Sequence, residues 1–347
     1  MITNDAPKVL TNFPNTRYMG SKRKLIPTIA QVVAQLNPKT ALDAFSGSGC
    51  VAYLFKEMGI QVTANDFLKF SYHIANASIS NSTTKLTAKD LEYLVDNKSG
   101  THTFIQDKYK GLYFTDEDNE FLDNLWWNID KLKNKHKKSL AFAAISRACI
   151  KRRPRGMFAY TGFRYDDGRK DLTLSLKEHF INAVKEWNDT VLDNGTLCAA
   201  ENKDVFDLSD KGYDLVYIDP PYVSPHSDND YTRRYHFVEG YITYWQGVDI
   251  QEHTKTKKMA SRPTRFSSKV TIMKAFDDLF GQFPNSTLLV SYSSNSIPSK
   301  AEMVDLLKSH KKHVEVVEVD YKYTFGNHGH KVGDNKNDVS EYLFIAK

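Results

Sequence analysis

Four consecutive residues, Asp219-Pro220-Pro221-Tyr222, place a carboxylate, a rigid backbone carbonyl and an aromatic ring directly after the apolar run 215–218. As structure alone, two prolines would simply end a strand. The carboxyl end of a buried parallel strand is, however, the place where α/β sheets bind their ligands. The pattern therefore predicts a reactive site at this position.

These groups suit methyl transfer to an amine on a planar base. The lone pair of such an amine is delocalised into the ring, which makes the nitrogen a poor nucleophile. Hydrogen bonds from its two hydrogens to the Asp219 carboxylate and the Pro220 carbonyl would favour a pyramidal nitrogen, while Tyr222 stacks on the base. The nitrogen would then attack a sulfonium methyl in line, and catalysis would come from positioning and electrostatics.

A glycine turn in the segment 43–49 (DAFSGSG) is the second candidate element. Gly47, Gly49 and Ala52 match the dinucleotide-binding spacing, and Asp66 follows at the distance of a ribose-binding acid. Alone, this pattern fits any cofactor with a ribose and a glycine-cradled tail, a nicotinamide dinucleotide included. It also fits a tight turn with a capping acid. The Asp-Pro-Pro-Tyr sequence downstream favours S-adenosylmethionine.

The elements that would position both motifs follow an α/β order. The pattern predicts a strand at 40–45, a helix at 50–58 ended by Gly59 and a strand at 61–65. Further helices are predicted at 24–36, 116–132 (with Thr115 as N-cap) and 298–309, and further strands at 196–200, 214–218, 287–291, 314–320 and 342–345. We therefore expect one α/β sheet flanked by helices and interrupted by two insertions.

This order divides the chain into a catalytic domain in three parts and two insertions. The catalytic parts are 1–83, which binds the cofactor, 195–222, which carries Asp-Pro-Pro-Tyr, and 284–347. The insertion 84–194 is mainly helical. By the family resemblance described below, it is a candidate target-recognition domain, and the insertion 223–283 is expected to contact DNA.

Charge distribution supports a polyanionic partner. The formal net charge is only +5, from 47 Lys and Arg against 42 Asp and Glu. However, ten basic residues and no acid occur within 131–155, and seven basic residues and one acid within 251–274. Each run alone could be a solvated face, but two runs in the two insertions favour phosphate contact.

Composition also excludes several classes of protein. Three cysteines without zinc-ligand spacing argue against disulfides and structural metal, and no apolar run is long enough to cross a membrane. No signal peptide is evident, so we expect a cytoplasmic protein. His328 and His330 lack further ligands and are interpreted as a polar turn, and no metal is expected.

With its motifs in this order, the chain resembles the alpha-group, Dam-like adenine-specific DNA methyltransferases of restriction-modification systems. The matching segments are Arg17-Tyr18-Met19-Gly20-Ser21-Lys22, Phe45-Ser46-Gly47-Ser48-Gly49, Asn65-Asp66, Asp219-Pro220-Pro221-Tyr222 and the pocket-wall strand Val290-Ser291-Tyr292. The resemblance implies a Rossmann-like, S-adenosylmethionine-dependent methyltransferase sheet.

The resemblance also implies roles for individual residues. Asp219, Pro220, Pro221 and Tyr222 would be catalytic. Lys22 would lie near the carboxylate of the cofactor, Asp66 would bind the ribose and Asp204 the adenine amino group. The full cofactor set would be Tyr18, Gly20, Lys22, Asp43, Phe45, Gly47, Gly49, Asp66, Asp204 and Phe206. As a structural alternative, Asp204 would only cap a strand end.

Candidate DNA contacts lie in both insertions. The first offers Lys151, Arg152, Arg153 and Arg155, and the second offers Arg233, Arg234, Tyr235, Lys257 and Lys258. The aromatics of the second set could fill the gap left by a flipped base. A helix face packed on the sheet would explain them equally, and neither insertion is assigned to base reading.

The predicted function is methylation of the N6 amino group of a flipped adenine in duplex DNA, with S-adenosylmethionine as cofactor. Cytosine N4 methylation is the nearest alternative, followed by an RNA or protein-amide methyltransferase. A non-catalytic nucleic-acid-binding protein with a methyltransferase fold and a nicotinamide dehydrogenase complete the alternatives. We expect a monomer, with double-stranded DNA as partner and a cognate restriction endonuclease as a further candidate partner.

Overall fold

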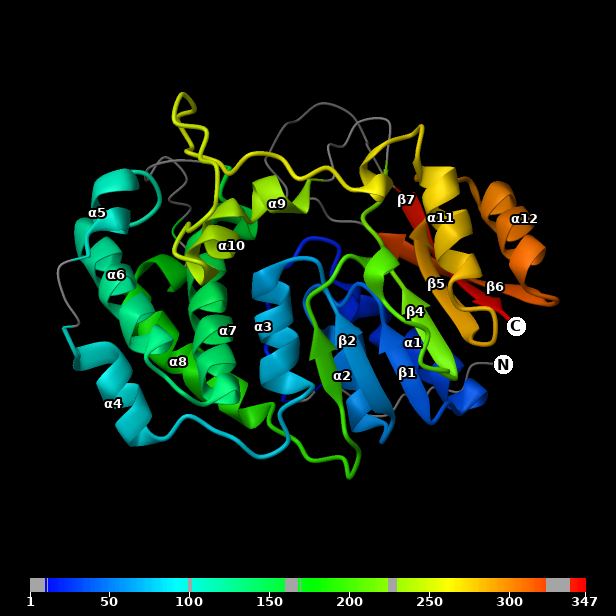
Figure 1. The fold of residues 1–347 in the computed structure, drawn as a ribbon, viewed down its shortest axis with the longest axis horizontal. Coiled ribbons are helices and arrows are strands. Elements are labelled where there is room, and N and C mark those ends of the chain that lie inside the picture. Colours follow the sequence, from blue (N-terminus) through cyan, green and yellow to red (C-terminus); the bar gives the residue numbers. More distant parts are fainter. Residues whose placement is uncertain are drawn as a thin grey trace.

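A seven-stranded sheet forms the centre of the computed structural model (Figure 1). The structure describes residues 10, 12–98, 102–159, 168, 170–223, 230–322 and 338–347. Strands β1 to β5 run parallel in the order β3-β2-β1-β4-β5, and β7 runs antiparallel between β5 and β6. The strands are Thr40–Asp43 (β1), Gln61–Asn65 (β2), Ala199–Glu201 (β3), Leu215–Ile218 (β4), Thr287–Ser293 (β5), Val314–Lys322 (β6) and Asp338–Ala346 (β7). The predicted Rossmann-like α/β sheet is confirmed.

The strand order places the two motifs side by side. After β1 the sheet grows in both directions, with β2 and β3 on one side and β4 and β5 on the other. Asp43 at the end of β1 is in register with Tyr217 of β4. The glycine turn and Asp219 therefore follow adjacent strand ends, at the topological switch point where open α/β sheets bind ligands.

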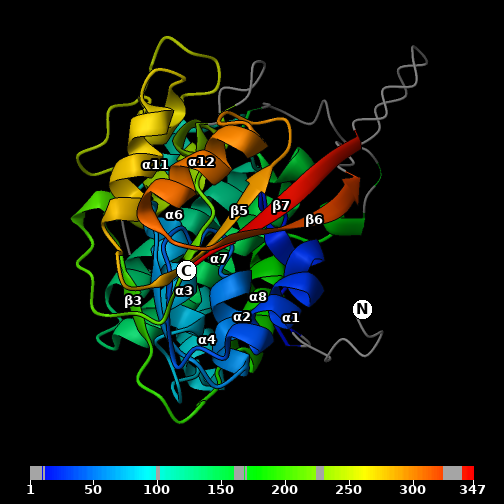
Figure 2. The ribbon, with the colours of Figure 1, turned by 90° about the vertical axis from the view of Figure 1, so that its right-hand side faces the viewer.

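Helices cover both faces of the sheet. Figure 2 shows α1 and α2 on one side of the sheet and α11 and α12 on the other. Alternate residues of β4 point to opposite sides, since Leu215 packs in the cluster of α1 and α2 and Val216 in the cluster of α11 and α12. The helices of these layers are α1 (Ile26–Leu36), which follows the short 3₁₀ turn η1 (Lys22–Leu25), α2 (Cys50–Glu57), α3 (Lys69–Ser78), α11 (Ile272–Gly281) and α12 (Lys300–His310).

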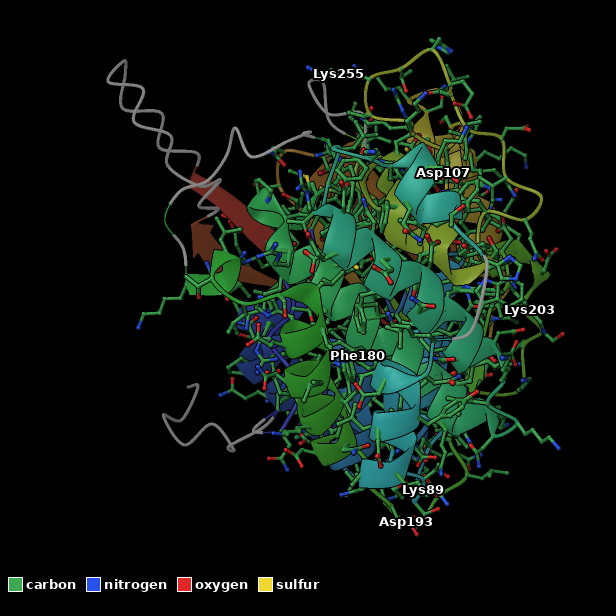
Figure 3. The ribbon with its side chains drawn as sticks, turned by 90° about the vertical axis from the view of Figure 1, so that its left-hand side faces the viewer. Lys89, Asp107, Phe180, Asp193, Lys203 and Lys255 are labelled. Carbon is green, nitrogen blue, oxygen red and sulfur yellow. The ribbon has the colours of Figure 1, made fainter. Side chains whose placement is uncertain are left out.

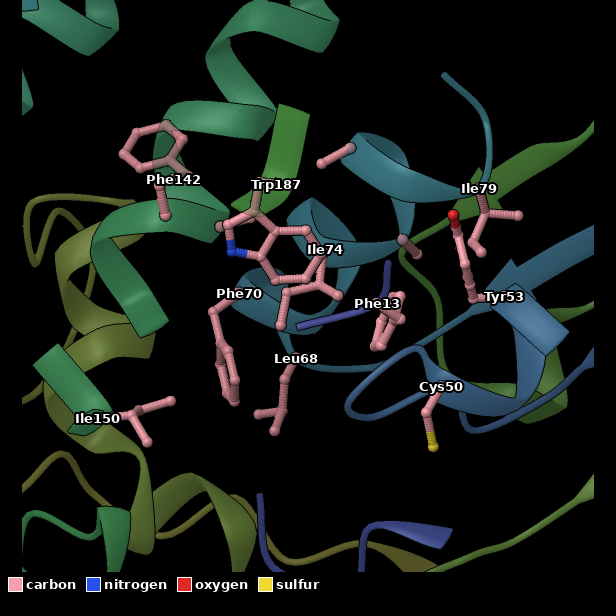
Figure 4. Packing of buried hydrophobic residues seen from close by; sticks show 14 of the residues in the cluster. Phe13, Cys50, Tyr53, Leu68, Phe70, Ile74, Ile79, Phe142, Ile150 and Trp187 are labelled. Carbon is pink, nitrogen blue, oxygen red and sulfur yellow. The ribbon is translucent and has the colours of Figure 1, made fainter. Parts of the chain in front are cut away.

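The first insertion packs into the same core as the sheet. Its helix α7 lies between α3 and α8 and is buried continuously from 139 to 150. Figure 4 shows Phe142 and Ile150 of α7 near Trp187 of α8 and Phe70 of α3. The helices of this insertion are α4 (Ala88–Asp96), α5 (Phe104–Lys108), α6 (Asp116–Asp130), α7 (Lys135–Arg152) and α8 (Leu176–Asp189), with 3₁₀ turns η2 (Pro154–Gly156) and η3 (Lys170–Leu172). Its mainly helical character is as predicted.

The second insertion runs across the carboxyl edge of the sheet (Figure 1). It begins with α9 (Tyr231–Arg234) and α10 (His236–Ile242), and η5 (Arg265–Ser267) precedes α11. Between α10 and η5, a bridge between Ile250 and Met259 closes a loop, which we call the basic loop (250–259).

Local sequence signals explain most element ends. Thr115 caps α6 by accepting a hydrogen bond from the amide of Asp118, as predicted. The predicted strand 196–200 is displaced, since β3 begins at Ala199. Thr196 is held in a turn by the Asn194 side chain, and Leu197 is 85% exposed. Among the described residues, no helix is long and apolar enough to cross a membrane.

A buried carboxylate fixes the second insertion to the sheet. Glu239 of α10 is almost fully buried, and its two oxygens accept hydrogen bonds from the amides of Lys69 and Phe70 at 3.0 Å each. These amides lie in the first turn of α3, where no preceding helical carbonyl can accept from them. Glu239 therefore caps α3 from a distant part of the chain.

We expect Glu239→Ala to lower the free energy of unfolding by about 2 kcal/mol, because it leaves buried amides without acceptors. Glu252→Ala is the matched control. Glu252 lies in the same insertion but is half exposed, and its ion pairs with Lys108 and Lys257 are of the kind that contribute less than about 1 kcal/mol. Urea denaturation measures both. Equal losses would contradict the capping role.

Candidate active site

One cavity at the carboxyl ends of β1, β2 and β4 collects nearly all the predicted site residues. Its lining includes every predicted catalytic residue and nine of the ten predicted cofactor residues: Tyr18, Gly20, Lys22, Asp43, Phe45, Gly47, Asp66, Asp204, Phe206, Asp219, Pro220, Pro221 and Tyr222. The exception is Gly49, which lies under the turn, where an added Cβ would be 3.1 Å from Ile74.

The glycine turn is shaped by close contacts. Gly47 has a φ of +48°, and a Cβ there would lie 3.0 Å from the ring of Tyr18. The amide of Gly47 donates a 2.7 Å hydrogen bond to the Asp66 carboxylate. Only a residue without a side chain meets both the conformation and the space.

Asp66 is positioned by backbone amides and remains open to a ligand. Besides the bond from Gly47, it accepts a 2.8 Å bond from the amide of Leu68. Burial raises its pKa to about 7, although the two amides oppose that shift. Each carboxylate oxygen has a further lone pair, so both can still accept hydrogen bonds from a diol.

Asp43 is a buried carboxylate whose oxygens have no hydrogen bond of standard geometry to any described residue. It is 1% exposed, and burial together with the charges of Asp219 and Asp66 raises its pKa, while the nearby amides of Phe45 and Ala52 oppose the shift. A buried acceptor without a partner is costly. Its place on the cavity wall suits a cationic group of a ligand.

Asp219 forms a buried ion pair with Lys22. The Lys22 ammonium is 2.8 Å from Asp219 Oδ1, and the Tyr222 hydroxyl donates to the same oxygen at 3.0 Å. Burial raises the pKa of Asp219, and Lys22 is the main group that opposes this shift. Among the described residues, Asp219 Oδ2 has no hydrogen-bond partner. The geometry therefore leaves one carboxylate oxygen available to the cavity.

Lys22 has partners within the protein that the sequence did not indicate. Its ammonium pairs with Asp219, also donates to the carbonyl of Gly20, and lies 4.7 Å above the ring of Tyr222. Its predicted place near a cofactor carboxylate stays a prediction. Although burial acts to lower it, the pKa of Lys22 is raised by Asp219 and Glu341, so the side chain is cationic. An ammonium that is 4% exposed needs such a counter-charge.

Aromatic side chains from the carboxyl edge of the sheet and from the second insertion form one wall of the cavity. Phe206 stacks on Phe266 with ring centroids 5.7 Å apart, and the edge of Phe45 meets Phe266. The guanidinium of Arg265 lies 4.0 Å above the Phe206 ring. Asp204 lines the cavity and also caps the 3₁₀ turn η4 (Val205–Asp207) by accepting a hydrogen bond from the amide of Phe206. Its contact with the adenine amino group of the cofactor stays a prediction.

Helix α9 and the residue after it hold the N-terminal segment against the cavity. The amide of Met19 donates to the Tyr235 hydroxyl at 2.7 Å, and the Tyr231 hydroxyl donates to the Met19 carbonyl at 3.2 Å. Tyr18 stacks on Tyr235 with centroids 5.2 Å apart. Tyr235 is fully buried, which contradicts its prediction as a DNA contact.

The basic residues of the first insertion are largely used inside the protein. Arg153 is buried and donates to the Tyr113 carbonyl, so its prediction as a DNA contact is wrong. Arg152 donates to two carbonyls and pairs with Asp118 at 3.1 Å. Lys151 is partly exposed and lies 3.5 Å from Asp171. The side chain of Arg155 lies outside the described residues.

The basic residues predicted in the second insertion are partly exposed. Arg233 and Arg234 are partly exposed on α9. Lys257 and Lys258 are partly exposed on the basic loop. Lys255 is exposed there, at the opposite end of the molecule from Lys89 and Asp193 (Figure 3). These four predicted DNA contacts, Arg233, Arg234, Lys257 and Lys258, remain predictions.

Several residues at the site were not predicted. Arg265 and Phe266 belong to the second insertion. Nothing in the sequence indicated that they line the same cavity as the glycine turn. Glu341 of β7 accepts a hydrogen bond from Tyr222 at 3.2 Å. The described residues contain no cluster of potential metal ligands, and His328 and His330 lie outside them.

A glycine turn after β1, an acid after β2 and Asp-Pro-Pro-Tyr after β4, all facing one cavity, define a methyltransferase that acts on an exocyclic amine. The sequence matches the D12 class N6 adenine-specific DNA methyltransferases over residues 18–318, so the chain belongs to this family. It is an adenine-specific DNA methyltransferase, and cytosine N4 methylation is set aside. The alpha-group, Dam-like subclass stays a prediction.

Similar proteins of known name are also methyltransferases. The type II methyltransferase M2.HphI of Haemophilus parahaemolyticus is 29% identical, over 96% of this chain and 98% of the relative. M.CviAII of Paramecium bursaria Chlorella virus 1 is 26% identical, over 95% and 97%. M.FokI of Planomicrobium okeanokoites is 27% identical over 95% of this chain, which spans about half the length of that relative.

We expect Lys22→Met to move the acidic limb of the methylation rate against pH to higher pH, by about one unit or more. Lys22 opposes the burial that raises the pKa of Asp219, so without the ammonium the carboxyl binds its proton at a higher pH. The rate would then be lost on acidification earlier than in the unmodified protein. Single-turnover methylation between pH 5.5 and 9 measures this.

Lys24→Met is the matched control, because Lys24 lies in the same 3₁₀ turn but is exposed. Its pH profile should match that of the unmodified protein. A Lys22→Met profile with an unmoved acidic limb would contradict the electrostatic role of this ion pair.

Proposed function

We propose that this chain transfers a methyl group from S-adenosylmethionine to an adenine flipped out of duplex DNA, within the cavity between the glycine turn and Asp219. The shared cavity is the observation that supports this proposal most directly. A methyl donor over the glycine turn and an amine at Asp219 would then occupy one enclosed space. In that arrangement, most of the catalysis comes from positioning.

The cavity suits the proposed cofactor. S-adenosylmethionine, when bound, supplies an electrophilic methyl group on a sulfonium. Asp43, a carboxylate with no hydrogen bond of standard geometry to a described residue, would hold the cationic amino group of the methionine end. Asp66 would accept from the ribose hydroxyls, and Phe206 would pack near the adenine ring. The Tyr18–Lys22 segment is proposed as the wall at the methionine end.

Asp219 is proposed as the acceptor for the substrate amine. Lys22 and Tyr222 both contact Oδ1, which positions the carboxylate and favours its anionic form against the effect of burial. Oδ2 would accept a hydrogen bond from the adenine amino group, and the Pro220 carbonyl would accept the other. The same carboxylate is placed to take the proton that the nitrogen loses once it carries the methyl group.

The second insertion is proposed as the main DNA-contacting surface. Its basic loop carries the exposed Lys255, while Arg152 and Arg153 at the end of α7 are bonded to carbonyls and a carboxylate of the protein. Phosphate contacts by such residues supply affinity without sequence information. Flipping the adenine costs a few kcal/mol of unstacking, which contacts in the cavity would offset.

We further propose that the protein supplies the modification activity of a restriction-modification system. The relatives described above are named type II methyltransferases. A cognate restriction endonuclease and a monomeric state belong to this proposal.

We expect Asp219→Ala to bind S-adenosylmethionine with an unchanged Kd but to reduce methyl transfer by about 10³-fold. Asp210→Ala is the control, because Asp210 is an exposed turn residue that precedes β4. Purified proteins are supplied with labelled cofactor and unmodified genomic DNA, and the nucleoside product is identified by mass. Full activity of Asp219→Ala, or a methylcytosine product, would overturn the proposed mechanism.

We expect Gly47→Ala to weaken S-adenosylmethionine binding by about tenfold or more, equivalent to at least about 1.4 kcal/mol. The new methyl group would push Tyr18 out of place. Gly59→Ala is the matched control, since Gly59 also has a positive φ, +79°, but has nothing within 4 Å of an added Cβ. Calorimetric titration should show normal affinity for Gly59→Ala. Equal weakening in both variants would mean that backbone strain, rather than the contact, decides binding.

A further inference from the structure

We propose that Glu341 is a positioning residue for methyl transfer, which acts by holding the Tyr222 hydroxyl against Asp219. This inference rests on the proposed role of Asp219. Glu341 is fully buried and is not among the described residues that line the cavity. Any effect on the reaction must therefore pass through a neighbour.

The contact with Tyr222 provides that route. The Tyr222 hydroxyl lies 3.0 Å from Asp219 Oδ1 and 3.2 Å from Glu341 Oε2. A tyrosine hydroxyl has one proton to donate. It is therefore within hydrogen-bond distance of two carboxylate oxygens that compete for its single proton.

The ring of Tyr222 is held on other sides as well. It meets the edge of Tyr292 at 4.9 Å between centroids, and the Lys22 ammonium lies 4.7 Å above it. Without Glu341, the hydroxyl end of the ring would keep only one of these two carboxylate contacts, the one with Asp219. The orientation of Asp219 Oδ1, and with it the availability of Oδ2, would then be less well defined.

The sheet explains how a residue so distant in sequence reaches the site. Glu341 of β7 is in register with Ser293 of β5, and β5 pairs in turn with β4, whose end carries Asp219. Three hydrogen-bonded strands thus connect the two carboxylates through a rigid support. Small displacements of reacting groups have large effects on rate, so a rigid support of this kind affects turnover more than binding.

Glu341 also affects the charges around Asp219. Lys22 is the cation paired with Asp219, and the nearby charge of Glu341 also raises the pKa of Lys22. Glu341 therefore helps to keep the ammonium charged beside Asp219. An uncharged amide at position 341 would lose this contribution but would keep an oxygen that accepts from Tyr222.

The test separates turnover from binding. We expect Glu341→Ala to lower the single-turnover methylation rate about tenfold, while KM for DNA and Kd for S-adenosylmethionine stay within about twofold. Glu341→Gln should retain at least about a third of the rate, because its amide oxygen still accepts. Glu318→Ala is the matched control, a half-exposed glutamate on the neighbouring strand β6 that should leave every constant unchanged.

A double-mutant cycle identifies the route. Tyr222→Phe removes the hydroxyl alone, so most of the loss of rate caused by Glu341→Ala should disappear in the Tyr222→Phe background. Additive losses would overturn the proposal, because Glu341 would then act elsewhere. Where Glu341→Ala does not fold, Glu341→Asp replaces it, since the shorter side chain withdraws the acceptor but keeps the charge.

Failure of this inference is distinguishable from failure of the proposed function. Unmodified protein that transfers no methyl group to adenine, or Asp219→Ala that remains active, would overturn the proposed function. An inactive Asp219→Ala combined with a fully active Glu341→Ala would overturn the role of Glu341 alone.

Discussion

A buried ion pair between Lys22 and Asp219 is the interaction on which the rest of the site depends. Ion pairs of this kind contribute little net stability, because desolvation of both charges offsets their attraction, but loss of one partner leaves a buried charge uncompensated. The main effect of this ion pair is therefore to position the groups around it rather than to stabilise the fold. It joins the N-terminal segment to the end of β4, occupies one oxygen of the carboxylate and leaves the other to the cavity.

Two distant parts of the chain support this pair. The segment before Lys22 is held by the hydroxyls of Tyr231 and Tyr235, and the insertion that carries them is fixed to the sheet by Glu239. The insertions are thus not independent lobes. The segment 262–267, which follows the basic loop, also forms part of the cavity wall. The surface proposed to meet DNA and the cavity proposed to hold the cofactor share one continuous stretch of chain.

The sequence predicts the catalytic half of this arrangement well, because its motifs are local. A strand followed at once by a glycine turn, or by Asp-Pro-Pro-Tyr, reveals its own geometry, and parallel strands bring such ends together. The remainder depends on contacts between distant residues. Composition could not show that Arg153 donates a hydrogen bond to a buried carbonyl or that Tyr235 is buried and stacks on Tyr18. It also could not show that Lys22 pairs with Asp219. Glu341 lies in an ordinary alternating strand and gave no signal.

The place of β7 has a consequence for biosynthesis. This strand lies between β5 and β6 in the sheet, yet it follows both in the chain. While the ribosome is still adding the residues after β6, the strand that pairs with both β5 and β6 is missing. Glu341, one of the two carboxylates that contact the Tyr222 hydroxyl, has then not yet been made. The glycine turn and Asp219 precede it in the chain, so the strand that carries Glu341 is the last part of the sheet to be synthesised.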